Sequence, residues 1–151
     1  KVIKFSNIPR YYGKVETNFG TGHVYDCIRD HSGKISQSLQ WYFKEGMTLK
    51  ELSPYLNQLK TYFIDNRIIF NHDMYEGNIL LQKISPQTQR LVVIDGLGDT
   101  VLIPFLNYLP SHVISKINRR WERFIKRLHE NYNSTLSVKK TGREDDNVTQ
   151  Q

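Results

Sequence analysis

The 151-residue sequence has a single cysteine and lacks any apolar run long enough to span a membrane. Cys27 has no partner within the chain, so the sequence does not indicate the disulfide framework that small secreted domains use. The longest apolar segment, 101–109, is much shorter than the roughly 20 residues of a spanning helix, and it contains Pro104. The five histidines show no metal-ligand spacing, and we therefore predict no zinc site.

The sequence also lacks a signal-peptide pattern, and it begins at Lys1 instead of Met. We therefore expect a segment of a longer cytoplasmic protein, with peripheral contact to the inner membrane as a candidate location. Hydrophobic residues make up 38% of the chain and aromatic residues 12%, which is too rich for a disordered chain and enough for one domain with a core. The net charge of +6 favours an anionic partner, although the same charge is within the range that keeps a small domain soluble.

Periodicity and turn residues predict short strands and amphipathic helices along the chain. One helix begins either at a capping box from Thr48 to Glu51 or at Pro54 just beyond it. The chain turns polar and aperiodic from Asn131, which predicts a disordered tail. In chain order, the predicted elements are a hairpin with strands at 11–17 and 23–28, a helix at 36–44, the helix that ends near 65, a short strand at 68–70, a second hairpin with strands at 78–84 and 90–95, and a final helix after Pro110.

The candidate chemistry lies at the start and at the end of the second predicted hairpin. Asp73 precedes Asn78 by five residues, and the second strand ends in Asp95 followed by Gly96. Phosphoryl transfer depends mainly on positioning and on neutralisation of negative charge by metal ions. Asp73 can accept the proton of an acceptor hydroxyl, whereas Asn78 and Asp95 can hold magnesium through their oxygens. Because a hairpin brings Asn78 and Asp95 to the same end, the pattern predicts a site for ATP and Mg²⁺.

Residues 71–80 resemble the catalytic and metal-binding loops that protein kinases share with aminoglycoside phosphotransferases and lipopolysaccharide-core sugar kinases. More narrowly, several segments resemble the YrbL family, the PhoP regulatory network proteins of Gram-negative bacteria. The sequence departs from the kinase pattern at Asn71, where kinases usually have His, and it lacks an aromatic-glycine pair directly after Asp95. The segments that carry the narrower resemblance are 8–17, 20–26, 65–68, 102–104 and 120–125.

The resemblance implies an α+β fold of the protein-kinase type. Residues 1–30 would be the remnant of a small lobe, residues 31–130 the large catalytic lobe, and residues 131–151 the tail. The resemblance also implies that residues from Asp26 to Ile28 form the hinge that binds adenine through backbone groups, with Leu80 as the apolar floor under the ring. The glycine-rich loop and the lysine of the small lobe are absent from this sequence, and we expect them upstream or not at all.

Three functions stay open from the sequence. The first is an ATP- and magnesium-dependent phosphotransferase that acts on a hydroxyl of a protein or of a cell-envelope glycan. The second is a pseudokinase that binds nucleotide and signals by conformation, which the absent glycine-rich loop and lysine favour. The third is a module that binds an anionic surface, such as a membrane, through the basic final helix, with Arg119, Arg123 and Lys126 as candidate contacts. The aromatic residues do not interleave with these cations as stacking platforms, which argues against nucleic acid.

Overall fold

A computed structural model of the chain describes residues 5–71, 74–98 and 110–141, with the side chains of the last segment described as far as Tyr132. The described residues form a mixed α+β fold with two small antiparallel sheets, which confirms the predicted class; the kinase type stays a prediction. In chain order, the elements are β1 (Tyr11–Thr17), β2 (Gly20–Tyr25), β3 (Gln37–Ser38), α1 (Leu39–Lys44), α2 (Leu49–Asn66), the 3₁₀ helix η1 (Glu76–Asn78), β4 (Ile79–Lys83), β5 (Gln89–Val93) and α3 (Pro110–Thr141).

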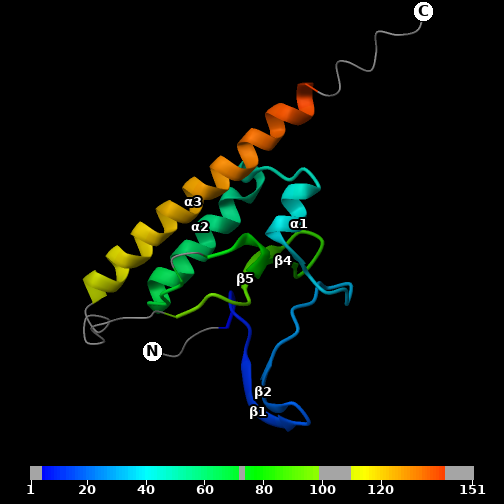
Figure 1. Cartoon of the computed structure of the whole chain (residues 1–151), viewed down its shortest axis with the longest axis vertical. Helices are drawn as coiled ribbons and strands as arrows, with labels where there is room; N and C mark the ends of the chain where they lie inside the picture. Colours follow the sequence, from blue (N-terminus) through cyan, green and yellow to red (C-terminus); the bar gives the residue numbers. More distant parts are fainter. Residues whose placement is uncertain (1–4, 72–73, 99–109, 142–151) are drawn as a thin grey trace, which may run out of the picture.

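Strands β1 and β2 form a two-stranded ribbon that projects from the body of the molecule (Figure 1). Lys14 pairs with His23, and the strands are joined by Asn18 and Phe19, so the connection is tighter than the predicted 18–22 turn. Side chains on both faces of the ribbon are largely exposed. A two-stranded ribbon on its own is only marginally stable, so its attachment to the body depends on contacts near its base.

The second sheet has the order β3-β4-β5, and its β4–β5 hairpin confirms the second predicted hairpin. Ile79 pairs with Val93 and Leu80 with Val92. Because side chains alternate across a strand, the two faces of the hairpin bury different partners. Ile79 and Val93 face the main core, whereas Leu80 and Val92 belong to a separate apolar cluster.

The main core lies between this sheet and the helices α2 and α3, which run side by side (Figure 1). Its centre is a group of aromatic rings. The ring centroid of Phe63 of α2 lies 5.1 Å from that of Phe70, and the centroid of Phe70 lies 6.1 Å from that of Trp121 of α3. The predicted strand at 68–70 is reduced to a single bridge between Phe70 and Leu97. None of the described helices is long and apolar enough to cross a membrane.

The structure decides where helix α2 begins and places the end of helix α3 later than predicted. The capping box is formed, because the Thr48 hydroxyl accepts from the Glu51 amide at 3.3 Å and a Glu51 carboxylate oxygen accepts from the Thr48 amide at 2.7 Å. Helix α2 therefore begins at Leu49, and Pro54 lies inside it. Helix α3 continues to Thr141, past the point where the predicted disordered tail begins, and residues 142–151 lie outside the described residues.

The capping box gives a stability prediction. Thr48→Ala removes the side chain that satisfies the Glu51 amide, and we expect it to lower the free energy of unfolding by about 1 kcal/mol, the usual cost of losing a helix cap. Urea denaturation measures this change. Thr61→Ala is the matched control, because Thr61 lies inside α2 and its hydroxyl donates only to the Asn57 carbonyl of the same helix. An equal loss in both variants would contradict the assigned role of the cap.

Candidate functional site

The β4–β5 hairpin brings the two predicted metal ligands to one end of the sheet. Asn78 directly precedes β4, and its carbonyl accepts a hydrogen bond from the Ile94 amide at 2.9 Å. Asn78 is therefore paired with the residue next to Asp95. The Asp95 side chain is exposed and accepts from the Gly96 amide at 2.6 Å, and Gly96 has a φ of +83° that few other residues adopt.

The segment that leads to Asp73 is attached to the same turn. The Asn71 amide donates to the Gly96 carbonyl at 2.7 Å, and the Gly98 amide donates to the Ile69 carbonyl at 2.9 Å. Asp73 itself and its neighbour His72 lie outside the described residues. The described hydrogen bonds thus place the start of the segment that carries Asp73 beside the turn that carries Asp95.

The oxygen donors at the hairpin end suit a magnesium ion that is held partly by a substrate. They do not form a metal site built from protein ligands alone. Within the described residues, no group of three or more His, Cys, Asp or Glu side chains could hold a metal ion. Asn78 is partly exposed and Asp95 is exposed, and both offer hard oxygen ligands. Mg²⁺ is usually held by one or two carboxylates together with substrate phosphates and water. The residues present therefore fit a magnesium ion that enters with a nucleotide.

An apolar cluster unites two of the predicted nucleotide-binding residues. Ile28, Leu80 and Val92 are 8%, 9% and 1% exposed and form a cluster of their own on the face of the hairpin opposite the main core. The sequence analysis did not include Val92, although it follows from pairing β5 with β4 in register, which places it opposite Leu80. Two of the three residues that the resemblance assigns to nucleotide binding thus lie in one apolar cluster.

The backbone of the predicted hinge is only partly available for hydrogen bonds. The Asp26 amide donates to the Arg10 carbonyl at 3.0 Å, and the Ile28 carbonyl accepts from the Ser36 amide at 3.0 Å. Cys27, between them, forms no hydrogen bond with the part of the chain that the structure describes. The Asp26 amide and the Ile28 carbonyl are therefore not available to a nucleotide base.

The side chain of Asp26 links the two strands at the base of the ribbon. Its carboxylate accepts from the Tyr12 hydroxyl at 2.7 Å and from the Arg10 amide at 3.0 Å. The hydrogen bond from Tyr12, followed by that from Arg10, lowers the pKa of Asp26 below its ordinary value. The same hydrogen bond is the main cause that raises the pKa of Tyr12. The carboxylate thus joins the two strands just before the hinge begins.

These hydrogen bonds predict a pH response. Tyr12→Phe removes the hydroxyl, and we expect the pKa of Asp26 to rise toward its ordinary value, as measured by NMR titration of the carboxyl carbon. Because the folded pKa is lowered, the contribution of Asp26 to stability is present above the ordinary pKa and is lost as the pH falls through the lowered one. Tyr11→Phe is the control, since the Tyr11 hydroxyl contacts His23 instead. An unchanged titration of Asp26 in Tyr12→Phe would refute the contact.

Helix α3 holds the segment around Asp73 from the other side. Arg120 donates to the Phe70 carbonyl, and Arg127 donates to the Met74 carbonyl. Both arginines belong to the basic final helix, yet Arg120 is buried and Arg127 is partly buried. A sequence signal does exist for Arg120, since it lies three residues after Ile117 on the apolar stripe of the helix.

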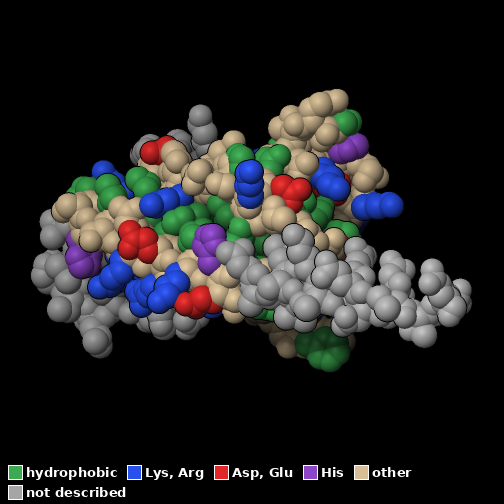
Figure 2. All heavy atoms as spheres, turned by 90° about the horizontal axis from the view of Figure 1, so that it is seen from above, with side chains coloured by type: hydrophobic (Ala, Val, Ile, Leu, Met, Phe, Trp, Pro, Cys, Tyr) green, Lys and Arg blue, Asp and Glu red, His purple; other side chains and the backbone are tan. Residues whose placement is uncertain are grey.

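The remaining predicted contact residues on α3 are exposed. Arg119, Arg123 and Lys126 all lie on the surface, and Lys126 forms an exposed ion pair with Glu130 at 3.8 Å. Figure 2 shows Lys and Arg side chains gathered on one part of the face in view, with acidic side chains among them. The structure therefore separates the cations of α3 into an exposed set and an inward-facing pair.

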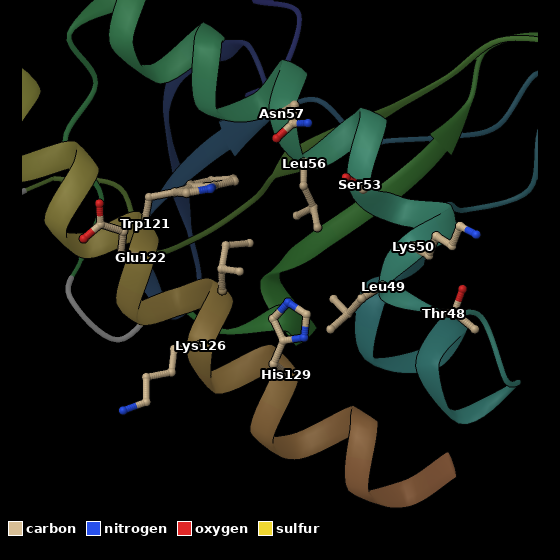
Figure 3. Close-up of a pocket in the computed structure, with 11 residues that line it drawn as sticks. Thr48, Leu49, Lys50, Ser53, Leu56, Asn57, Trp121, Glu122, Lys126 and His129 are labelled. Carbon is tan, nitrogen blue, oxygen red and sulfur yellow. The ribbon is translucent and has the colours of Figure 1, made fainter. Parts of the chain in front are cut away.

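A cavity of about 700 Å³ lies between the first turns of α2 and the middle of α3. Figure 3 shows Leu49 and His129 pointing into this space, whereas the ammonium group of Lys126 points away from it. Leu56 and Trp121 add apolar wall. The cavity is lined by none of the residues of the hairpin end or of the Ile28 cluster, so it is separate from the predicted nucleotide site.

Comparison with known proteins gives the chain a family. The family model described as PhoP regulatory network protein YrbL matches residues 1–129, and the chain belongs to this family. The chain is 40% identical over 124 residues to proteins named "Uncharacterized protein YrbL" from Escherichia coli (strain K12) and from Shigella flexneri. Each match covers 80% of this chain and 59% of the relative, so the chain spans less than two thirds of the length of these relatives.

Proposed function

We propose that this YrbL-family chain carries the catalytic centre of an ATP- and magnesium-dependent phosphotransferase with a protein-kinase-like fold. The observation that supports the proposal is the arrangement around the β4–β5 hairpin. One face of the hairpin carries Leu80 and Val92, which cluster with Ile28. One end of the hairpin carries Asn78 and Asp95, which offer oxygen ligands. Leu80 lies two residues from Asn78, or about 6.6 Å along an extended strand, so a single bound nucleotide can reach both.

In this proposal the nucleotide base lies against Leu80, and Val92 supports Leu80 from within the same cluster. The edge of the base is bound by backbone groups of the hinge other than the Asp26 amide and the Ile28 carbonyl, which already have partners in the chain. Buried apolar surface with a few directed polar groups is the usual composition of a nucleotide or cofactor pocket. The hinge residues Asp26 and Ile28 then act as supports, since their own backbone groups hold the segment in place.

The phosphates extend toward the hairpin end. Asn78 and Asp95 hold magnesium, which neutralises the charge of the transferring phosphoryl group. Asp73 accepts the proton of the attacking hydroxyl and orients its oxygen. The acceptor is a hydroxyl, either of a protein Ser or Thr or of a cell-envelope glycan.

Three substitutions separate the proposed roles, and they are made in the full-length gene product. Asp95→Asn removes the charged metal ligand, and we expect loss of both magnesium-dependent ATP binding and phosphoryl transfer. Asp73→Asn should keep ATP binding and lower transfer by about 10²–10⁴, the range for losing a positioned acid–base group. Asn78→Ala should weaken both to an intermediate degree. Calorimetry with ATP and Mg²⁺ measures binding, and a phosphate-transfer assay measures turnover.

The same experiment distinguishes the pseudokinase. ATP binding without turnover in the wild-type protein would favour a nucleotide-binding regulatory module over an enzyme. Absence of ATP binding with and without Mg²⁺ would defeat both nucleotide-based functions. Equal effects of Asp73→Asn and Asp95→Asn on binding would contradict the assigned division between proton acceptor and metal ligand.

A second candidate function is binding to an anionic surface. The observation that favours it is the exposure of Arg119, Arg123 and Lys126 at spacings of three and four residues, which places them on one side of α3. An anionic membrane attracts such a row of cations. The family proteins could then work while attached peripherally to the inner membrane, and this function does not exclude the phosphotransferase.

Reversal of these charges tests the second candidate. Changing Arg119, Arg123 and Lys126 to Glu should weaken binding to liposomes that contain anionic lipid, and the loss should shrink at high salt because the attraction is screened. The matched control reverses the exposed Lys34, Lys44 and Lys50, which changes the net charge equally on other elements. Equal effects of both triple variants would show that net charge, and not the α3 surface, determines binding.

A further inference from the structure

The connector between β2 and β3, residues 28–36, folds back on itself into a loop. Its two arms meet in an antiparallel bridge between Arg29 and Ile35. The loop begins with Ile28, which is 8% exposed and belongs to the same apolar cluster as Leu80 of β4. The position of the loop on the sheet therefore determines where the predicted hinge lies relative to Leu80.

The Asp30 side chain attaches this loop to the end of strand β4. One carboxylate oxygen, Oδ1, accepts from the Ser36 hydroxyl at 2.6 Å and from the Lys83 amide at 3.0 Å. The His31 amide donates to the Lys83 carbonyl at 2.7 Å. Asp30 is partly buried and Ser36 is buried, so water competes little for the bond between them. The carboxylate thus takes the place that a backbone carbonyl would have beside the last residue of β4.

The side chain of Gln82 forms a second link between the loop and the sheet. Its amide nitrogen donates to the Arg29 carbonyl at 2.7 Å, and its amide oxygen accepts from Arg90 Nε at 2.8 Å. Because Arg90 offers only donors, it requires the oxygen of Gln82 and leaves the NH₂ group for the Arg29 carbonyl. Gln82 is two residues from Leu80, so both side chains lie on the face of the hairpin that carries the Ile28 cluster.

We propose that Asp30 and Gln82 are positioning residues for the nucleotide base, an inference that rests on the proposed function. Gln82 holds the residue that directly follows Ile28, and Asp30 holds the next residue of the loop. Ile28 and the hinge before it consequently have a fixed place against Leu80, where the proposed base lies. Binding then requires little ordering of the loop, and a preorganised site binds its ligand more tightly.

These contacts lie at the opposite end of the hairpin from the proposed metal ligands. Gln82 is four residues from Asn78, which is about 13 Å along an extended strand. The Asn78 backbone bonds to Tyr75 and Ile94, neither of which belongs to the loop. Loosening of the loop should therefore weaken nucleotide binding and leave the rate of the saturated enzyme unchanged.

A matched pair of variants at Asp30, made in the full-length protein, tests this inference. Asp30→Leu removes the acceptor oxygen, whereas Asp30→Asn keeps one oxygen that can accept both hydrogen bonds. We expect Asp30→Leu to weaken the affinity for ATP with Mg²⁺ about tenfold, the usual order when a hydrogen-bond partner is left unsatisfied, and Asp30→Asn to stay within about threefold of the wild type. Calorimetry measures both affinities. At saturating ATP, kcat should stay within about twofold in both variants.

Gln82→Glu is the sharper change, because it keeps the oxygen that faces Arg90 and removes only the donor to the Arg29 carbonyl. We expect about a tenfold loss of ATP affinity with kcat again unchanged. Gln87→Glu is the control, since it introduces the same charge at an exposed position in the turn of the same hairpin and should leave the affinity unchanged. Wild-type affinity in both Gln82→Glu and Asp30→Leu would overturn the inference. So would a fall in kcat equal to the fall in affinity, since that is the mark of general destabilisation.

Hydrogen exchange without nucleotide gives a readout that does not depend on activity. The amides of His31 and Ser36, which hold the loop closed, should exchange at least about tenfold faster in Asp30→Leu than in the wild type, because the loop opens more often. Unchanged exchange at both amides would contradict the attachment of the loop through Asp30. Faster exchange in a protein whose wild type binds no ATP would overturn the proposed function together with the role in base binding, and would leave Asp30 and Gln82 as structural contacts only.

Discussion

The register of the β4–β5 hairpin is the constraint on which the rest of the structure depends. Pairing Ile79 with Val93 sends one set of side chains into the main core and the alternate set, including Leu80 and Val92, into the small apolar cluster. A slip by one residue would exchange these two faces, and burial on both sides therefore fixes the register strongly. The same register brings Asn78 and Asp95 to one end of the hairpin. The packing that fixes the register therefore also determines which residues meet at the proposed site.

The main core also determines which side of helix α3 faces the backbone at Phe70 and Met74. The aromatic contacts of Phe63, Phe70 and Trp121 fix the rotation of this helix. That rotation turns Arg120 and Arg127 inward to backbone carbonyls and leaves Arg119 and Arg123 in solvent. Burying a guanidinium is costly unless its donors are satisfied. The carbonyls at the ends of the segment 70–74 supply acceptors for this purpose, so the helix and the segment stabilise each other.

Local patterns predicted the elements well, because their causes lie close together in the sequence. Alternation predicted both hairpins, and the spacing of Thr48 and Glu51 predicted a capping box that the structure contains. Contacts between distant residues have no such signature. The composition of α3 indicated a basic surface, whereas the position of Arg120 on the apolar stripe and its hydrogen bond to the Phe70 carbonyl show that Arg120 is not part of it. The hinge was likewise placed by resemblance, and no local pattern indicates that the Asp26 amide is bonded to the Arg10 carbonyl and the Ile28 carbonyl to the Ser36 amide.

The sheet and helix α3 hold different parts of the proposed site in place. The apolar cluster and the hinge belong to the hairpin and to the connector from β2, while the segment before Met74 is held by the core and by α3. These two supports meet at the hydrogen bonds between Asn71 and Gly96 and between Gly98 and Ile69. If the proposed function holds, nucleotide affinity and phosphoryl transfer depend on different packing and can change separately.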